Sequence, residues 1–160
     1  MPSKPKPKST SKLPDRADML EVASGCACLS VRRAARAMSR AYDEELRDTG
    51  LRMTQVSLLV AVGLHGEVTV SRLAQTLDLE RTTLTRELKP LRERNLLTVR
   101  AGEDRRERIV ELTDAGAEAL TDALPRWRAA QQRALAGIDA GDWHTLLGHL
   151  DRAAAQAASA

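Results

Sequence analysis

The sequence predicts a mostly α-helical (α+β) fold in which a helix-turn-helix and a β-hairpin stand between long terminal helices. Apolar residues recur at helical spacing over most of the chain. This period changes only after residue 96, where short β-branched or apolar runs at 97–99 and 109–110 flank the charged, Gly-containing segment 101–108. Such a pattern is typical of two strands joined by a turn.

The N-terminal segment, residues 1–17, is rich in Pro, Lys and Ser and has almost nothing to bury, so we expect a disordered basic tail. Residues 18–48 then show one long helical pattern of small and apolar residues, which Thr49-Gly50 ends. This helix is longer than a lone compact domain usually requires. We therefore expect it to pack against a second copy of the chain.

Two shorter helices are expected next. Thr54 is the expected N-cap of a helix that reaches about His65, with apolar residues on its inner face. A second, short helix opens at Thr69 or Val70 and covers residues 71–77. Together with the helix that follows it, this short helix predicts a helix-turn-helix.

The third helix of this group begins after Leu79. Leu84, Leu88 and Leu91 recur at i, i+4 and i+7 and are expected to lie against the core. Pro90 removes one helical hydrogen bond, so we expect a bend or an early loosening of the helix one turn before it. The first two turns then remain the regular part, and the turns beyond Pro90 are expected to be scaffold.

A last pair of helices follows the hairpin. Thr113 is the expected cap of a helix that runs to about Gly137, and Asp139 or Asp142 opens the final one. Their apolar faces, with the first long helix, suit a dimerisation module. The predicted organisation is a tail (1–17) and one domain (18–156), made of a winged helix-turn-helix (51–112) and dimerisation helices (18–48 and 113–156).

The charge of the chain is concentrated in its tail. Residues 1–16 carry a net +4, whereas the whole chain of 160 residues carries +3, so residues 17–160 are net −1. The net charge of the domain therefore does not indicate nucleic-acid binding. A local excess of basic residues does: residues 80–108 hold nine basic and six acidic side chains. No apolar run approaches a membrane span and no apolar segment follows the N-terminal lysines. We expect a cytoplasmic protein without a membrane partner.

Short polar and basic side chains gather on the outward side of the third helix. Threonine offers a hydroxyl and a methyl group to base edges, and arginine can pair bidentately with guanine. Arginines of the hairpin can reach a narrow minor groove. The alternatives are a solvated helix face and an exposed turn of mixed charge. The candidate DNA-binding residues are Arg81, Thr82, Thr83, Thr85, Arg86, Lys89, Arg105, Arg106 and Arg108.

The order of the elements resembles the MarR family of winged-helix transcription regulators over nearly all of residues 20–150. The resemblance rests on GLRMTQVSLL, on VSRLAQTLDLERTTLTRELKPLRERNLL, and on Asp104-Arg105-Arg106 ahead of a strand and an LTDAG helix start. It implies a homodimer that binds an inverted-repeat operator in double-stranded DNA as a repressor, released by a small-molecule effector or by an oxidant. It also implies that Arg106 enters the minor groove and that Asp104 positions it through a charge-assisted pair.

Cys26 and Cys28 leave two interpretations open. The placement of Cys28 in CLSVRRAARAM resembles the reactive cysteine of the hydroperoxide-sensing branch of this family, but GLRMTQVSLL lacks the tyrosines that pair with that thiol. A sensing thiol requires a lowered pKa and access to solvent. Otherwise both cysteines are small apolar residues of the dimer helix.

Other classes of function find little support in the sequence. The histidines form no i, i+4 pair, and a lone Cys-x-Cys lacks the partners of a zinc site. A phosphate-binding Gly loop and a nucleophile elbow are also absent. We therefore expect neither a metal, nor a cofactor, nor an enzyme. The rival functions are a redox switch that uses Cys26 or Cys28 and a winged helix that binds protein partners.

Overall fold

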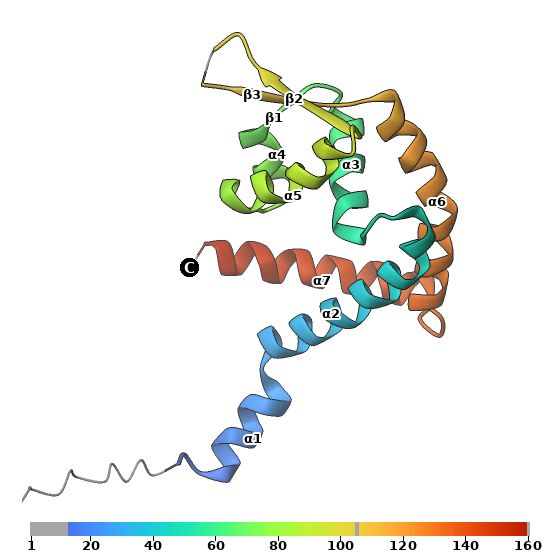
Figure 1. The fold of residues 1–160 in the computed structure, drawn as a ribbon. Helices are drawn as coiled ribbons and strands as arrows, with labels where there is room; N and C mark the ends of the chain where they lie inside the picture. Colours follow the sequence, from blue (N-terminus) through green and yellow to red (C-terminus); the bar gives the residue numbers. More distant parts are fainter. Residues whose placement is uncertain (1–12, 105, 160) are drawn as a thin grey trace, which may run out of the picture. The chain divides into compact units, whose positions relative to one another are not determined.

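The computed structural model describes residues 13–104 and 106–159 (Figure 1). It divides into two compact units, residues 1–37 and 38–160. Most of the predicted tail, 1–17, lies outside the described residues. Within the described ranges no helix is both long and apolar enough to cross a membrane.

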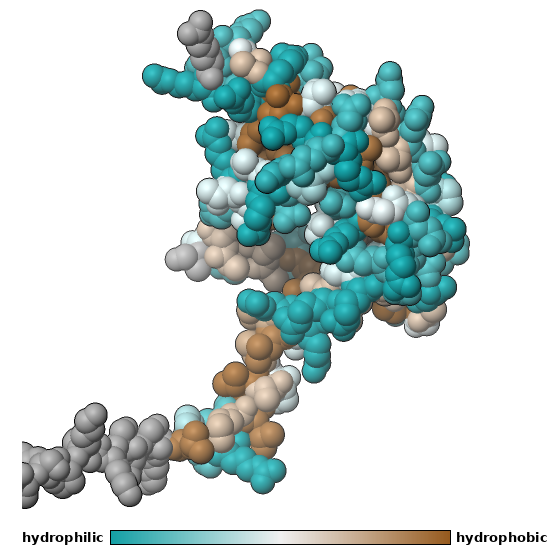
Figure 2. All heavy atoms as spheres, viewed as in Figure 1, coloured by the Kyte–Doolittle hydropathy of each residue, from teal (hydrophilic) through white to brown (hydrophobic). Residues whose placement is uncertain are grey.

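The first unit contains α1 (Arg16–Gly25) and the beginning of α2 (Ala27–Leu46). The prediction of one continuous helix over 18–48 is wrong, because Cys26 has an extended backbone (φ −71°, ψ 111°) between the two helices. Gly25 precedes this break, and glycine is a poor helix former. None of the α1 side chains is buried (Figure 2). The exposed apolar residues of this unit include Met19, Leu20, Val22, Leu29 and Val31.

The second unit begins within α2 and contains all the remaining elements. These are η1 (Arg47–Thr49), α3 (Met53–His65), β1 (Val68–Thr69), α4 (Val70–Thr76), α5 (Arg81–Glu93), β2 (Leu97–Ala101), β3 (Arg108–Leu112), α6 (Asp114–Ala134) and α7 (Ala140–Ala158). Gly50 ends η1 with φ +67°, the left-handed conformation that favours glycine.

The N-terminus of α3 is capped from elsewhere in the chain. The prediction that Thr54 is the N-cap is wrong: the cap position is Arg52. The Asp43 carboxylate on α2 accepts a hydrogen bond from the Met53 amide (2.7 Å), and the Gln55 side chain accepts one from the Arg52 amide (3.0 Å). A tertiary contact thus replaces the local Thr cap.

The helix-turn-helix is formed as predicted. Thr69 caps α4 by accepting a hydrogen bond from the Arg72 amide (3.1 Å). Helix α5 continues through Pro90 to Glu93, so the predicted early loosening of this helix does not occur. The three leucines of its inner face are buried in the core, which fixes the rotation of α5 about its axis. Its opposite side is therefore presented to solvent.

The predicted hairpin is also confirmed. Strands β2 and β3 pair antiparallel with Val99 opposite Val110, and β1 pairs with the other side of β3 through Val68, giving the strand order β1-β3-β2. The two-residue strand β1 was not predicted from the sequence. Val110 is fully buried, so the sheet face that carries it packs against the helices.

The last two helices start at the expected kinds of cap. Thr113 caps α6 by accepting a hydrogen bond from the Gly116 amide (3.0 Å). Asp139, and not Asp142, is the N-cap of α7. Helix α6 ends at Ala134, three residues short of the predicted Gly137, and no side chain of α7 is buried. Apolar side chains of α7, Leu146, Leu147 and Leu150, are exposed.

Polar contacts join α6 to the end of α2. The hydroxyl of the buried Tyr42 donates a hydrogen bond to Gln131, and burial raises the pKa of that hydroxyl. Glu45 forms an ion pair with Arg133. These contacts fasten α2 and α6 within the second unit.

Candidate nucleic-acid interface

The outward side of α5 and the hairpin enclose a groove of about 650 Å³. Its floor is apolar and comes from α4, α5 and β2, through Val70, Leu88 and Val99. Above the floor stand polar and basic side chains. They are Arg81, Thr82, Thr85, Arg86, Lys89 and Arg92 from α5 and Arg108 from β3.

Most of the predicted helix residues meet in this groove. Arg81, Thr82, Thr85, Arg86 and Lys89 line it as a group, and all five are exposed. The Thr85 hydroxyl donates to the Arg81 carbonyl (2.8 Å), so its oxygen remains an acceptor and its methyl an apolar contact. The arrangement presents several donors and the methyl groups of two threonines to a ligand in the groove.

Thr83 lies apart from this group. It lines a separate hollow of about 370 Å³, together with Leu77 and Leu79 before α5 and Glu87 on α5. The helix period turns Thr83 away from Thr82 and Thr85. Its role in DNA binding stays a prediction.

Arg92 was missed by the reasoning from sequence, which assigned the turns after Pro90 to scaffold. It lines the same groove because Arg81, Thr85, Leu88 and Arg92 stand at i, i+4, i+7 and i+11, which is the spacing of one helical stripe. The signal was therefore present in the spacing, since the stripe continues regularly through Pro90.

The groove is electropositive, since the described residues that line it include five basic and no acidic side chains. Two of the five have acidic neighbours on α5: Arg86 lies 4.0 Å from Glu87 and Lys89 lies 3.8 Å from Glu93. The guanidinium groups of Arg81, Arg92 and Arg108 form no ion pair or hydrogen bond with the described part of the chain. Their donors are free for an external anion.

The tip of the hairpin is held by backbone contacts. The Gly102 amide donates to the Glu107 carbonyl (3.1 Å), and the Glu107 amide donates to the Asp104 carbonyl (2.9 Å). The Asp104 carboxylate accepts a hydrogen bond from the Arg106 backbone amide (2.8 Å). Asp104 thus shapes the turn that carries Arg106, and within the described residues it forms no ion pair with the Arg106 guanidinium. Arg105 lies outside the described residues.

The base of the hairpin is braced by a charged cluster on the outer face of the sheet. Arg100 on β2 donates to Glu111 on β3 (2.9 Å) and forms an ion pair with Glu67 just before β1 (2.6 Å). These contacts raise the pKa of Arg100, and the hydrogen bond from Arg100 lowers the pKa of Glu111. Arg100 is therefore engaged within the sheet, unlike Arg108 on its other face.

The two cysteines lie in the first unit. Cys26 is half-buried at the break between α1 and α2, and Cys28 is exposed in the first turn of α2. Both are free thiols. Among residues 13–104 and 106–159, no three His, Cys, Asp or Glu side chains are grouped to hold a metal ion.

Comparison with a protein-family model matches residues 49–107 to the MarR family. Among curated proteins, the uncharacterized HTH-type transcriptional regulator YwoH of Bacillus subtilis is 34% identical over 83 residues. That match covers 52% of this chain and 61% of YwoH, so the chain spans less than two thirds of this relative's length.

Among solved structures, the M. tuberculosis transcriptional regulator MosR in complex with DNA is 41% identical, with a TM-score of 0.74. The alignment covers 82% of this chain and 98% of MosR. A mutant of E. coli MarR complexed with operator DNA has a TM-score of 0.77 at 19% identity, with 84% of this chain and 97% of that one covered. This second likeness shows a shared winged helix-turn-helix fold.

Proposed function

The chain belongs to the MarR family of transcriptional regulators, and we propose that it binds double-stranded DNA sequence-specifically through the groove between α5 and the hairpin. The observation that carries this proposal is the electropositive groove itself: among the described residues, its lining includes three unpaired arginines and no acidic side chain. The similar MosR structure, a complex with DNA, supports it. We also propose a cytoplasmic location, as expected for a transcriptional regulator of this family.

In this function α5 enters the major groove and the hairpin acts as the wing. Arg81, Thr82 and Thr85, at the beginning of α5, reach the base edges, because the N-terminal residues of a recognition helix make these contacts. The wing tip carries Arg106 into the adjacent minor groove. Contacts with phosphates supply much of the affinity, so binding falls steeply as the salt concentration rises.

The functional unit in this proposal is a homodimer on an inverted repeat, and its role is that of a repressor. Each unit of the chain leaves apolar side chains exposed near a terminus: Leu20 and Val22 on α1, and Leu146 and Leu150 on α7. A second copy is the economical partner for such surfaces. A small-molecule effector would release the operator by binding better to the form that does not bind DNA.

Selection of bound sequences from random DNA tests the proposal. We expect enrichment of a palindrome, with half-sites about one helical turn apart. A monomer in gel filtration that still binds DNA tightly would contradict the dimer. A selection that enriches no sequence would refute specific DNA binding and favour a winged helix that binds protein partners.

A redox switch is the second candidate, and the break at Cys26 favours it. This residue is outside both helices, and Cys28 is exposed two positions later, so neither thiol is locked in a packed core. Oxidation by a hydroperoxide would convert the two thiols to a disulfide and the hydroperoxide to an alcohol and water. Closing this bridge would change the backbone around the break.

The cysteine variants separate the two candidates. If the thiols sense peroxide, the parent loses DNA affinity on treatment and the Cys26→Ser/Cys28→Ser variant does not. Cys28→Ser alone shows whether Cys28 is required. A double variant that responds to peroxide as the parent does would eliminate the redox candidate.

A further inference from the structure

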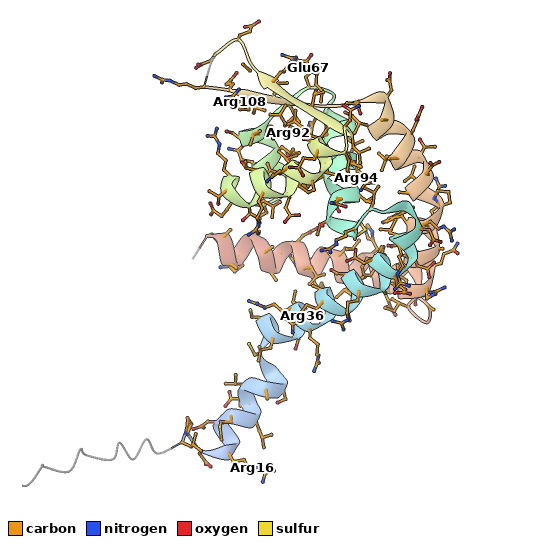
Figure 3. The ribbon with its side chains drawn as sticks, in the orientation of Figure 1. Arg16, Arg36, Glu67, Arg92, Arg94 and Arg108 are labelled. Atoms are coloured by element: carbon orange, nitrogen blue, oxygen red, sulfur yellow. The ribbon has the colours of Figure 1, made fainter. Side chains whose placement is uncertain are left out.

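Arg92 and Arg108 line the same groove and come from different elements (Figure 3). Arg92 lies near the end of α5, and Arg108 is the first residue of β3. Neither guanidinium is engaged within the described part of the chain. Two guanidinium groups that line one groove without a carboxylate partner among the described residues favour an anionic ligand in that groove.

The register of the hairpin explains why Arg108 points into the groove. Arg108 pairs with Ala101, two positions along β3 from the Val99–Val110 pair, and residues two apart share one face of a sheet. That face packs on the helices, and Arg108 lies just beyond the edge of the core. Arg106, in contrast, belongs to the turn at the tip. Arg106 and Arg108 are therefore expected to meet different parts of a ligand.

The length of the helical stripe places Arg92 outside the base-reading part of α5. Arg81 and Arg92 are eleven residues apart, which is about 16 Å along a helix axis. The major groove is about 12 Å wide. If the beginning of α5 reads base edges, Arg92 reaches the sugar-phosphate backbone at the border of that groove.

We propose that Arg92 and Arg108 together hold the DNA backbone that separates the major groove, entered by α5, from the minor groove, entered by the wing tip. This inference rests on the proposed function. One strand of the duplex must pass between the helix and the wing tip, and the groove that these two residues share lies there. The planar guanidinium fork suits phosphate oxygens. The contact positions the protein and reads no bases.

The test is the salt dependence of binding by Arg92→Ala and Arg108→Ala, each measured on the selected operator and on an unrelated duplex of equal length. Log affinity falls as log salt concentration rises. Each lost phosphate contact makes this slope shallower by about 0.9, or by about 1.8 for a dimer that loses two contacts. Over a fourfold rise in KCl the parent then loses about 12-fold more affinity than either variant. The ratio of operator to unrelated affinity stays within about twofold, because phosphate contacts carry no sequence information.

Two further variants make the result specific. Arg128→Ala removes the same charge from an exposed position on α6 and should leave the slope unchanged. Arg92→Lys keeps the charge and should retain the parent slope. Thermal unfolding followed by circular dichroism checks that the variants fold, which we expect because the replaced side chains are exposed and unpaired.

The possible failures are distinguishable. If both alanine variants show the same salt slope as the parent, the proposed backbone contact is wrong, although operator binding itself still stands. If the ratio of operator affinity to unrelated-duplex affinity falls while the salt slope is unchanged, these arginines read bases. That result would also contradict the proposed backbone contact. A parent that binds no duplex overturns the proposed function and this inference together.

Discussion

Replacement of Gly116 by alanine should destabilise the fold, although helix propensity alone predicts the opposite. Gly116 lies in the first turn of α6, where alanine would favour the helix by up to about 1 kcal/mol. A Cβ atom on Gly116, however, would lie 1.9 Å from the carbonyl oxygen of Leu96 and 2.8 Å from a Leu112 methyl group. Atoms this close must move apart by more than about 1 Å.

The Leu96 carbonyl has little freedom to move. It accepts a hydrogen bond from the Thr113 amide (3.3 Å), while the Thr113 hydroxyl donates to the neighbouring Asn95 carbonyl (2.7 Å) and caps α6. Separating α6 from this turn weakens the cap and the hydrogen bond, each worth about 1 kcal/mol, and adds overpacking of about 1–3 kcal/mol. The expected net loss in the free energy of unfolding is about 3 kcal/mol.

Urea unfolding at a fixed protein concentration measures this loss, since the apparent stability of the proposed dimer would depend on concentration. Gly148→Ala on α7 is the matched control, because its Cβ would meet nothing closer than 4.0 Å. That variant should be more stable than the parent by about 0.5–1 kcal/mol. If Gly116→Ala is as stable as the parent, the steric argument for this glycine is wrong.

Three other predictions concern the wing and the helix cap. Arg106→Ala should weaken operator binding strongly and leave the melting temperature unchanged; equal affinity in a binding titration would remove the wing tip from the mechanism. Glu111→Gln should remove a contribution to stability that is present above about pH 4.5, because its partner Arg100 holds the folded-state pKa of Glu111 below the ordinary value of 4.5. The difference between parent and variant should therefore shrink as pH falls through that lowered pKa, and a pH-independent difference in urea titrations would contradict it. Asp43→Ala should lower the free energy of unfolding by about 1 kcal/mol through loss of its bond to the Met53 amide, whereas Asp43→Asn should retain most of it.

Regular periodicity made most of the helices and the hairpin predictable from the sequence. The spacing of the buried leucines of α5 and of the paired valines of the hairpin shows which face of each element is apolar. That face is then the one that packs in the core. Thr69, Thr113 and Asp139 were identifiable as caps because each acts within its own first turn. These features depend on residues that are close in sequence.

Two of the features that were missed, the cap of α3 and strand β1, depend on contacts between distant segments. The cap of α3 comes from Asp43, ten residues earlier, and no local pattern shows that it replaces Thr54. The two-residue strand β1 exists only because β3 lies beside it. The break at Cys26 had a local signal in Gly25, but the apolar spacing across it outweighed that signal. For Asp104, Arg106 was correctly expected as the partner, but the Asp104 carboxylate accepts a hydrogen bond from the Arg106 backbone amide and does not pair with its guanidinium within the described residues.

The distribution of partners among the arginines connects the fold with the proposed function more closely than the net charge does. Arg100 is held by two carboxylates on the outer face of the sheet, so its charge braces the wing. Arg108, on the opposite face, lines a groove with Arg81 and Arg92, and the described lining of this groove includes no acidic side chain. Like charges that line one groove destabilise the protein that carries them, and none of these three forms an ion pair within the described residues. Such a cost is typical of a functional site. A polyanion placed in the groove removes the repulsion, which is why the unpaired arginines, and not the basic tail, point to DNA.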